Sequence, residues 1–240
     1  MIRRTVLKGI GALAALSALA PLRSPAAEPL RIGVIGAGWQ GGTLGRLWVR
    51  AGHEVMFSSR NLDRVRADIA GLGARATAGT SQQAAAFGSV LLFATPYDAL
   101  PELGRELAEE IRGKIVLDAC NPPAGSALAR EAESIGVGVM SARLLPGTRL
   151  VRAFSSVDAT QLEASAGRST DKLAVPLASD DEDALHVAAQ LVRDAGSEPV
   201  IVGPLAEARL FQRGGPGFRL HTNAPELRRR LGLTEEVTSK

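Results

Sequence analysis

The sequence is poor in the residues that build disulfides, metal sites and nucleic-acid surfaces. It has one cysteine, Cys120, in 240 residues and therefore cannot form an internal disulfide. The three histidines, His53, His186 and His221, are not closely spaced to one another or to Cys120, so we expect no metal site. Aromatic residues make up 4% of the chain and no basic stripe is present, so nucleic acid is not expected as a partner.

The chain also lacks an apolar run long enough to remain in a bilayer. The run from Gly9 to Leu22 is shorter than the roughly 20 residues that a membrane span needs. It follows Arg3 and Arg4 and precedes small residues at 24–29, so 1–27 resembles a cleavable twin-arginine signal peptide. We therefore expect export of the folded protein to the periplasm, with no stable membrane span after cleavage; an uncleaved anchor or a general secretory signal stays open.

Beyond this segment, apolar runs alternate with stretches of helical periodicity. The expected strands are 31–36, 54–59, 90–95, 114–119, 149–154, 172–179 and 198–204, and the expected helices are 40–52, 62–73, 98–113, 127–136, 182–196 and 224–232. Strands that are apolar throughout are typical of a parallel sheet covered on both faces. The pattern predicts an α/β fold with a doubly wound, mostly parallel sheet over 28–155 and a C-terminal strand-helix-strand extension and tail over 156–240.

Three glycines, Gly36, Gly38 and Gly41, have the spacing GxGxxG between the first strand and the first helix. In this position the glycines allow a tight turn, close approach of the backbone to a pyrophosphate, and close packing of helix on strand. The motif predicts a Rossmann-like dinucleotide site, and a glycine-rich turn without a ligand is the alternative. The expected cofactor-binding residues of the loop are Gly36, Ala37, Gly38, Trp39, Gln40 and Gly41.

No acidic residue ends the second strand, where NAD-selective folds usually place one to bind the ribose 2′-hydroxyl. Ser58, Ser59 and Arg60 stand there instead, and Arg64 follows one helical turn later. Guanidinium groups and hydroxyls suit a phosphate, so the pattern favours NADP over NAD. An ordinary capped turn with a solvated Arg64 is the alternative.

Several segments between about 30 and 210 resemble one family. "IGVIGAG", "GHEVMFSSR", "ATPYDAL", "KIVLDACNP", "VRAF" and "DAGSEPVIVGPLAEAR" are similar to the NADPH-dependent reductases of the deazaflavin coenzyme F420 and to the related cytoplasmic domains of six-transmembrane metalloreductases. The resemblance implies that Ser59, Arg60 and Arg64 hold the 2′-phosphate of NADP. It also implies that Ala94, Thr95 and Pro96 line the nucleotide cleft, and that a hydride passes between NADP(H) and a flat acceptor such as a deazaflavin or flavin.

Hydride transfer between stacked rings depends mainly on positioning, so no general acid or base is assigned. Asn121 is expected to contact the nicotinamide ribose, since it follows a strand at the carboxyl edge of the sheet. We expect Tyr97 to be a packing or helix-start residue, Cys120 a small buried residue and His221 a surface residue. In place of the family's common Asn-Thr after "AF", this chain has two serines, and its tail at 212–240 is unfamiliar, so the acceptor site is expected to differ most.

Three other functions stay open. The chain can be an exported NADP-binding protein without turnover, a metal-chelate reductase, or a reductase of cyclic imines. Reductases of cyclic imines have a long helical second half. The strands expected at 172–179 and 198–204 argue against that class. A hydroxyacid dehydrogenase is not expected, because beyond residue 27 the lysines are Lys114, Lys172 and Lys240, none on a helix facing the cleft. A homodimer is neither indicated nor excluded.

Overall fold

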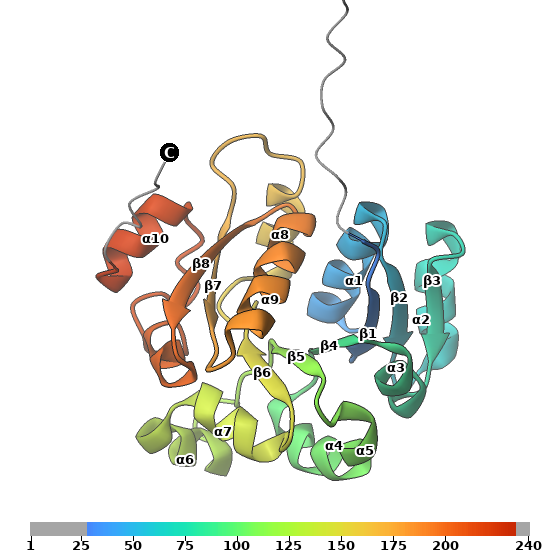
Figure 1. Ribbon diagram of the computed structural model, residues 1–240, viewed down its shortest axis with the longest axis horizontal. Helices are drawn as coiled ribbons and strands as arrows, with labels where there is room; N and C mark the ends of the chain where they lie inside the picture. The colour runs from blue at the N-terminus through green and yellow to red at the C-terminus, as the bar shows by residue number, and fades with distance from the viewer. Residues whose placement is uncertain (1–27, 234–240) are drawn as a thin grey trace, which may run out of the picture.

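The structure is a computed structural model, and residues 28–233 of it are described. It contains an eight-stranded sheet with the order β3-β2-β1-β4-β5-β6-β7-β8 (Figure 1). Strands β1 to β6 run parallel, β7 pairs antiparallel with β6, and β8 is parallel to β7. The prediction of a doubly wound, mostly parallel α/β sheet is confirmed.

The bounds of the elements follow the expected alternation. The strands are β1 (Arg31–Ile35), β2 (Glu54–Ser58), β3 (Ala76–Gly79), β4 (Val90–Phe93), β5 (Ile115–Asp118), β6 (Arg149–Arg152), β7 (Ala174–Ala178) and β8 (Glu198–Gly203). The α-helices are α1 (Trp39–Ala51), α2 (Leu62–Ile69), α3 (Ser81–Phe87), α4 (Leu100–Glu106), α5 (Ala108–Ile111), α6 (Ala127–Ile135), α7 (Val137–Leu144), α8 (Ala159–Ser165), α9 (Glu182–Asp194) and α10 (Ala224–Leu231). Short 3₁₀ turns occupy Ala70–Leu72, Tyr97–Ala99 and Leu205–Leu210.

Four of these strands and α-helices, β3, α3, α7 and α8, were not expected from the sequence. Strand β3 consists of small residues and has no apolar run to reveal it. The helix expected over 98–113 is divided into a 3₁₀ turn, α4 and α5. Gly104 of α4 lies against the backbone of α7, where a Cβ atom would overlap the carbonyl of Leu144, so this glycine permits close helix packing.

Apolar side chains alternate between the two faces of the sheet. Ile32 and Val34 of β1 enter the core beneath α1 and α9, while Leu91 and Phe93 of β4 enter the core beneath α3, α4 and α7. Figure 1 shows α8 and α9 on one side of the central strands and α4 to α7 on the other. A third, smaller core lies between β7, β8 and α10. Both faces of the sheet are thus covered, as a parallel sheet requires.

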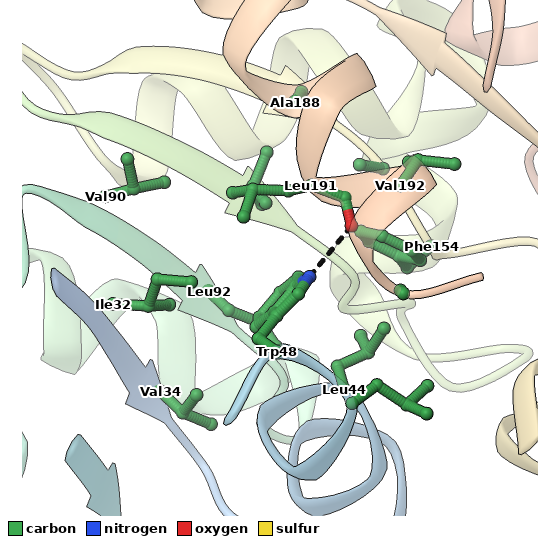
Figure 2. Close-up of a cluster of buried hydrophobic side chains, with 14 of the residues drawn as sticks. Ile32, Val34, Leu44, Trp48, Val90, Leu92, Phe154, Ala188, Leu191 and Val192 are labelled. Carbon is green, nitrogen blue, oxygen red and sulfur yellow. Dashed lines mark hydrogen bonds between the residues drawn. The ribbon is translucent and has the colours of Figure 1, made fainter. Parts of the chain in front are cut away.

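Trp48 of α1 occupies the middle of the core beneath α1 and α9 (Figure 2). It is fully buried, its indole Nε1 donates to the carbonyl of Leu191 in α9 at 2.8 Å, and its ring packs edge-on against Phe154 at 5.9 Å between centroids. Phe154 has a left-handed φ of 58° and begins the loop that follows β6. The core therefore anchors the start of a loop at the carboxyl edge of the sheet.

The single paired position of β6 and β7 decides where the C-terminal part lies. The paired residues, Arg152 and Ala178, are the last residues of their two antiparallel strands. Strand β7 therefore runs mostly beyond the carboxyl end of β6, and β8 and α10 accompany it (Figure 1). These elements continue the same sheet and extend past the edge where an α/β sheet binds its ligands. The domain boundary expected at 155/156 falls between β6 and α8 and stays a prediction.

Candidate functional site

Each glycine of the GxGxxG turn meets a different steric demand. Gly36 has a φ of 100°, and a Cβ there would lie 2.6 Å from the carbonyl oxygen of Ala94. A Cβ on Gly41 would overlap the carbonyl oxygen of Gly36, so this glycine lets α1 pack on the turn. A Cβ on Gly38 would meet no protein atom within 4 Å. The space beside Gly38 is therefore open to a ligand, while Gly36 and Gly41 serve the turn itself.

The N-terminus of α1 is free to bind an anion. Its N-cap residue, Gly38, has no side chain that could cap the helix, and no acidic residue lies in the first turn. The N–H of Ala37 is already bound to the carbonyl of Ser58, but the first N–H groups of the helix have no intrahelical partners. Together with the open side of Gly38, this arrangement fits the pyrophosphate of a dinucleotide.

A first cavity of about 560 Å³ opens beside the turn. Its lining includes the turn from Gly36 to Gly38, the end of β2 with Ser59 and Arg60, and the end of β4 from Ala94 to Pro96. Helix α4 forms the opposite wall with Glu102 and Glu106. The cavity therefore brings together three of the segments that the sequence assigned to one nucleotide site.

Arg64 lines a second cavity of about 410 Å³, which also includes Gly38. Ala37 and Gly38 line both cavities, whereas Arg46 and Trp39 contribute to the second one. The guanidinium of Arg64 lies 3.6 Å from the carboxylate of Asp68, with both side chains at least half exposed. Trp39 is 68% exposed, which is unusual for so large an apolar side chain. Arg60 and Arg64 thus line two different cavities that share Ala37 and Gly38.

Ser58 requires a correction. Its side chain is fully buried, and its hydroxyl donates to the carbonyl of Val34 at 2.9 Å. The hydroxyl ties β2 to β1 inside the sheet and does not face either cavity. Because a residue at the end of a strand points to the face opposite its neighbour's, only Ser59 of the two serines lines the first cavity.

A third cavity, of about 250 Å³, lies at the carboxyl ends of β5 and β6. It is lined by Gln40, Ala119, Asn121, Phe154, Ser155, Val157, Asp158, Arg213, Phe218 and Arg219. The amide of Gln40 donates to the carbonyls of Phe154 and Val157, at 3.0 and 3.1 Å. Gln40 therefore connects the start of α1 to the loop after β6. Gln40 and Asn121 do not line the first cavity, to which the turn contributes Gly36, Ala37 and Gly38.

Beneath this cavity lies a buried ion pair that the sequence analysis missed. Arg152 and Asp118, paired across β6 and β5, are both fully buried, and the guanidinium lies 2.6 Å from the carboxylate. Arg152 also donates to Oδ1 of Asn121 at 2.7 Å, and Nδ2 of Asn121 donates to the carbonyl of Ser155 at 2.7 Å. The network fixes the orientation of the Asn121 amide. The available signal was a charged residue at the end of each strand, directly after apolar residues, in the sequences IVLD of β5 and RLVR of β6.

Two residues near the strand ends are structural. Tyr97 is fully buried and its hydroxyl lies 3.1 Å from Oγ of Ser141, and burial raises its pKa to about 12. Burial likewise raises the pKa of the Cys120 thiol, which lies 3.8 Å from the hydroxyl of Thr95. Neither group is suited to proton transfer near neutral pH.

His221, expected as a surface residue, is only partly exposed and also makes a long-range contact. Its side chain is 21% exposed, and its Nε2 accepts the N–H of Asp158 at 3.2 Å. Burial lowers the pKa of His221, since removal from water disfavours the charged imidazole. The histidine therefore fastens the C-terminal segment to the loop after β6, a long-range contact that no local pattern reveals.

The part of the chain that the structure describes has neither a cluster of metal ligands nor a membrane-spanning helix. No three His, Cys, Asp or Glu side chains of residues 28–233 gather where they can hold a metal ion. Among the same residues, no helix combines the length and the apolar character of a membrane span.

Comparison with known proteins identifies the family of the first half. Residues 31–122 match the model of the family described as NADP oxidoreductase, coenzyme F420-dependent. The chain is 31% identical over 204 residues to the F420-dependent NADP reductase of Methanothermobacter thermautotrophicus, covering 78% of this chain and 87% of that protein. This relative extends the similarity well beyond the matched segment.

Two further proteins are similar to the chain. It is 28% identical over 182 residues to the metalloreductase STEAP3 of Rattus norvegicus, covering 76% of this chain and 36% of the rat protein, so the chain spans about a third of that relative's length. The hypothetical protein SMa0349 of Sinorhizobium meliloti has a similar structure, with a TM-score of 0.68 and 25% identity over 82% of this chain and 96% of that one.

Three features of the site agree with these matches. They are the open space at Gly38 in the GxGxxG turn, the arginines that line the cavities beside it, and the absence of an acid at the end of β2. The chain belongs to the family of coenzyme F420-dependent NADP oxidoreductases.

Proposed function

We propose that the protein transfers a hydride between NADP(H), bound along the first and second cavities, and a flat acceptor such as a deazaflavin or flavin. The observation that carries the proposal is the open space at Gly38 beside the free N-terminus of α1, with Arg60 and Arg64 in the two cavities that Gly38 lines. Such a site offers N–H groups to a pyrophosphate and guanidinium groups to a further phosphate.

In this proposal each segment has a separate role. The glycine turn and the start of α1 bind the pyrophosphate, while Ser59, Arg60 and Arg64 bind the 2′-phosphate. The strand end from Ala94 to Pro96 supports the nucleotide, and Asn121 lies toward its nicotinamide end. NADPH supplies the hydride when bound, and the protein's part is to hold the two rings face to face and to exclude water.

The states of Tyr97 and Cys120, which rule both out as proton donors near neutral pH, agree with this role. Tyr97 is hydrogen-bonded inside the core with its pKa raised to about 12, and Cys120 is buried. Direct hydride transfer between rings asks for positioning, and the Asn121 amide has its orientation set by Arg152 and Ser155. The activity therefore does not require a titrating side chain at the cavity.

The assignment of the 2′-phosphate is tested by comparing Arg60→Gln with Arg66→Gln. Arg66 is a matched control, because it is exposed on α2 and pairs with Asp63 outside both cavities. The dissociation constants of NADPH and NADH are measured by nucleotide fluorescence. We expect Arg60→Gln to weaken NADPH binding about tenfold, the loss of one charge-assisted contact, and to leave NADH unchanged. Equal weakening of both nucleotides would remove Arg60 from the 2′-phosphate site.

Turnover is tested separately, by the loss of NADPH absorbance with deazaflavin, FMN or riboflavin as acceptor. Consumption of NADPH with at least one of these acceptors is the expected result. Tight NADPH binding without consumption by any of them would instead support a binding protein that retains its nucleotide.

A further inference from the structure

We propose that the third cavity binds a negatively charged group of the hydride acceptor, and that Arg213 of the C-terminal segment is the residue that selects for it. The inference rests on the proposed function, since it names the class of acceptor that the site takes. The acceptor class is a small planar molecule that carries a carboxylate or phosphate.

The position of the third cavity relative to the glycine turn suits an acceptor. Gly38 lines the first cavity and Gln40, two residues later in the same turn of α1, lines the third. Similarly, Ala94 at the end of β4 faces the first cavity, while Ala119 at the end of β5 faces the third. A nucleotide that follows the carboxyl edge of the sheet away from Arg60 therefore arrives beside the third cavity.

The outer wall of the third cavity comes from the segment between the 3₁₀ turn at Leu205–Leu210 and α10. This segment is fastened to the loop after β6 by backbone and side-chain bonds: the N–H of Arg219 donates to the carbonyl of Ser156, and His221 accepts the N–H of Asp158. Arg219 and His221 both have left-handed φ angles, of 54° and 47°. The chain is thus held in an uncommon conformation that places the segment over the cavity.

The charges of the third cavity do not cancel. Asp158 is bound by Arg219, whose Nε lies 3.0 Å from the carboxylate, and the buried Asp118 is bound by Arg152. Among the described residues, Arg213 forms no ion pair, and its guanidinium lies over the ring of Phe218 at 5.2 Å from the centroid. The cavity therefore keeps one uncompensated positive charge, and stacking on the ring fixes where that charge lies.

A buried hydroxyl lies in the wall of the third cavity. Ser155 lines the cavity and is 6% exposed, and its Oγ has no hydrogen-bond partner among the described residues. Its carbonyl accepts from the amide of Asn121. Because this Oγ is shielded from solvent, the guanidinium of Arg213 is the group that suits an oxygen-bearing anion.

The test compares two acceptors that share one ring system and differ in charge, FMN and riboflavin. Their dissociation constants are measured on the full-length protein saturated with NADP⁺, by quenching of flavin fluorescence. We expect FMN to bind about tenfold more tightly than riboflavin, and the ratio to fall toward one as ionic strength rises. The variant Arg213→Met, which retains an apolar stem, is expected to abolish the ratio, while Arg213→Lys retains most of it.

Arg230→Met is the matched control, because Arg230 is an exposed arginine of α10 that is in no ion pair within the described residues and does not line the cavity. It should leave the ratio unchanged. A ratio near one in the unmodified protein, an undiminished ratio in Arg213→Met, or failure of both flavins to bind would overturn the inference. The two proposals fail separately. Equal consumption of NADPH with FMN and riboflavin would support the hydride-transfer activity and contradict the selection by Arg213. Selective binding of FMN without consumption of NADPH would support the selection and contradict the activity.

Discussion

Gly38 and Gly41 are three positions apart in one motif, yet the structure gives them different tasks. Gly38 has an ordinary negative φ of −76° and open space where a Cβ would be placed. Gly41 has no such space, because the carbonyl of Gly36 occupies it. One glycine therefore leaves room for a ligand and the other leaves room for the protein.

This difference predicts opposite outcomes for the two alanine variants. Gly38→Ala should weaken NADPH binding about tenfold and leave the melting temperature unchanged, because the added methyl group meets only the ligand. Gly41→Ala should lower the free energy of unfolding by about 1–3 kcal/mol, because the methyl group forces α1 away from the turn. Nucleotide fluorescence and urea unfolding measure the two effects. A destabilised Gly38→Ala with unchanged binding would contradict the assignment.

Between elements, the ends of β5 and β6 are joined by the buried pair of Asp118 and Arg152. Both side chains have lost their hydration, and the carboxylate also accepts the N–H of Cys120 at 2.9 Å. The guanidinium Nε has no partner among the described residues. A buried pair of this kind adds little net stability but is costly to break, because the remaining charge stays buried.

We therefore expect Arg152→Met to lower the free energy of unfolding by about 3–5 kcal/mol. The double variant Asp118→Asn, Arg152→Met should recover part of this loss, since no uncompensated charge remains and the asparagine still accepts from Cys120. Urea unfolding of both single variants and the double variant measures the coupling. Additive losses would show that the two residues act independently. NADPH consumption is measured alongside, because Arg152→Met also releases Oδ1 of Asn121.

At the scale of the whole molecule, the proposed nucleotide site and the proposed export present a difficulty. Nicotinamide nucleotides are made and recycled in the cytoplasm, which an exported protein leaves. The segment 1–27, on which that proposal rests, lies outside the described residues. A pathway for folded proteins resolves part of the difficulty, since the protein can bind NADP in the cytoplasm and carry it across. A single cysteine, buried in the fold, is compatible with folding in a reducing compartment.

We predict that the unmodified protein, isolated from the exported fraction of its own host, contains NADP. Replacement of Arg3 and Arg4 by lysine should retain the protein in the cytoplasm while leaving its NADPH affinity unchanged. Cell fractionation locates the protein, and native mass spectrometry followed by denaturation identifies the bound nucleotide. Export of the lysine variant at the normal level would contradict the twin-arginine proposal. Exported protein that is empty and does not take up NADPH would contradict the nucleotide site.

The parts of the fold that were predicted correctly are those with strong local signals. Strand β4 is a continuous apolar run, β1 and β5 are apolar except for one charged end residue each, and α1 and α9 have apolar residues at helical spacing. Strand β3 lacked such a signal, because its small residues are held by pairing with β2 rather than by their own propensity. The side-chain direction of Ser58 and the long-range contact of His221 were missed for the same reason. Both depend on segments that are distant in the sequence and adjacent in the fold.

The sequence by itself determined the glycine turn, the missing acid after β2 and the alternation of strands and helices, because each of these depends on residues close together in the chain. Only the tertiary structure decided which groups meet. Asp118 faces Arg152 because two strands pair in one register, and Arg213 reaches the edge of the sheet because β7 reverses direction at the end of β6. Contacts between distant segments are set by packing and strand pairing, which local sequence patterns do not encode.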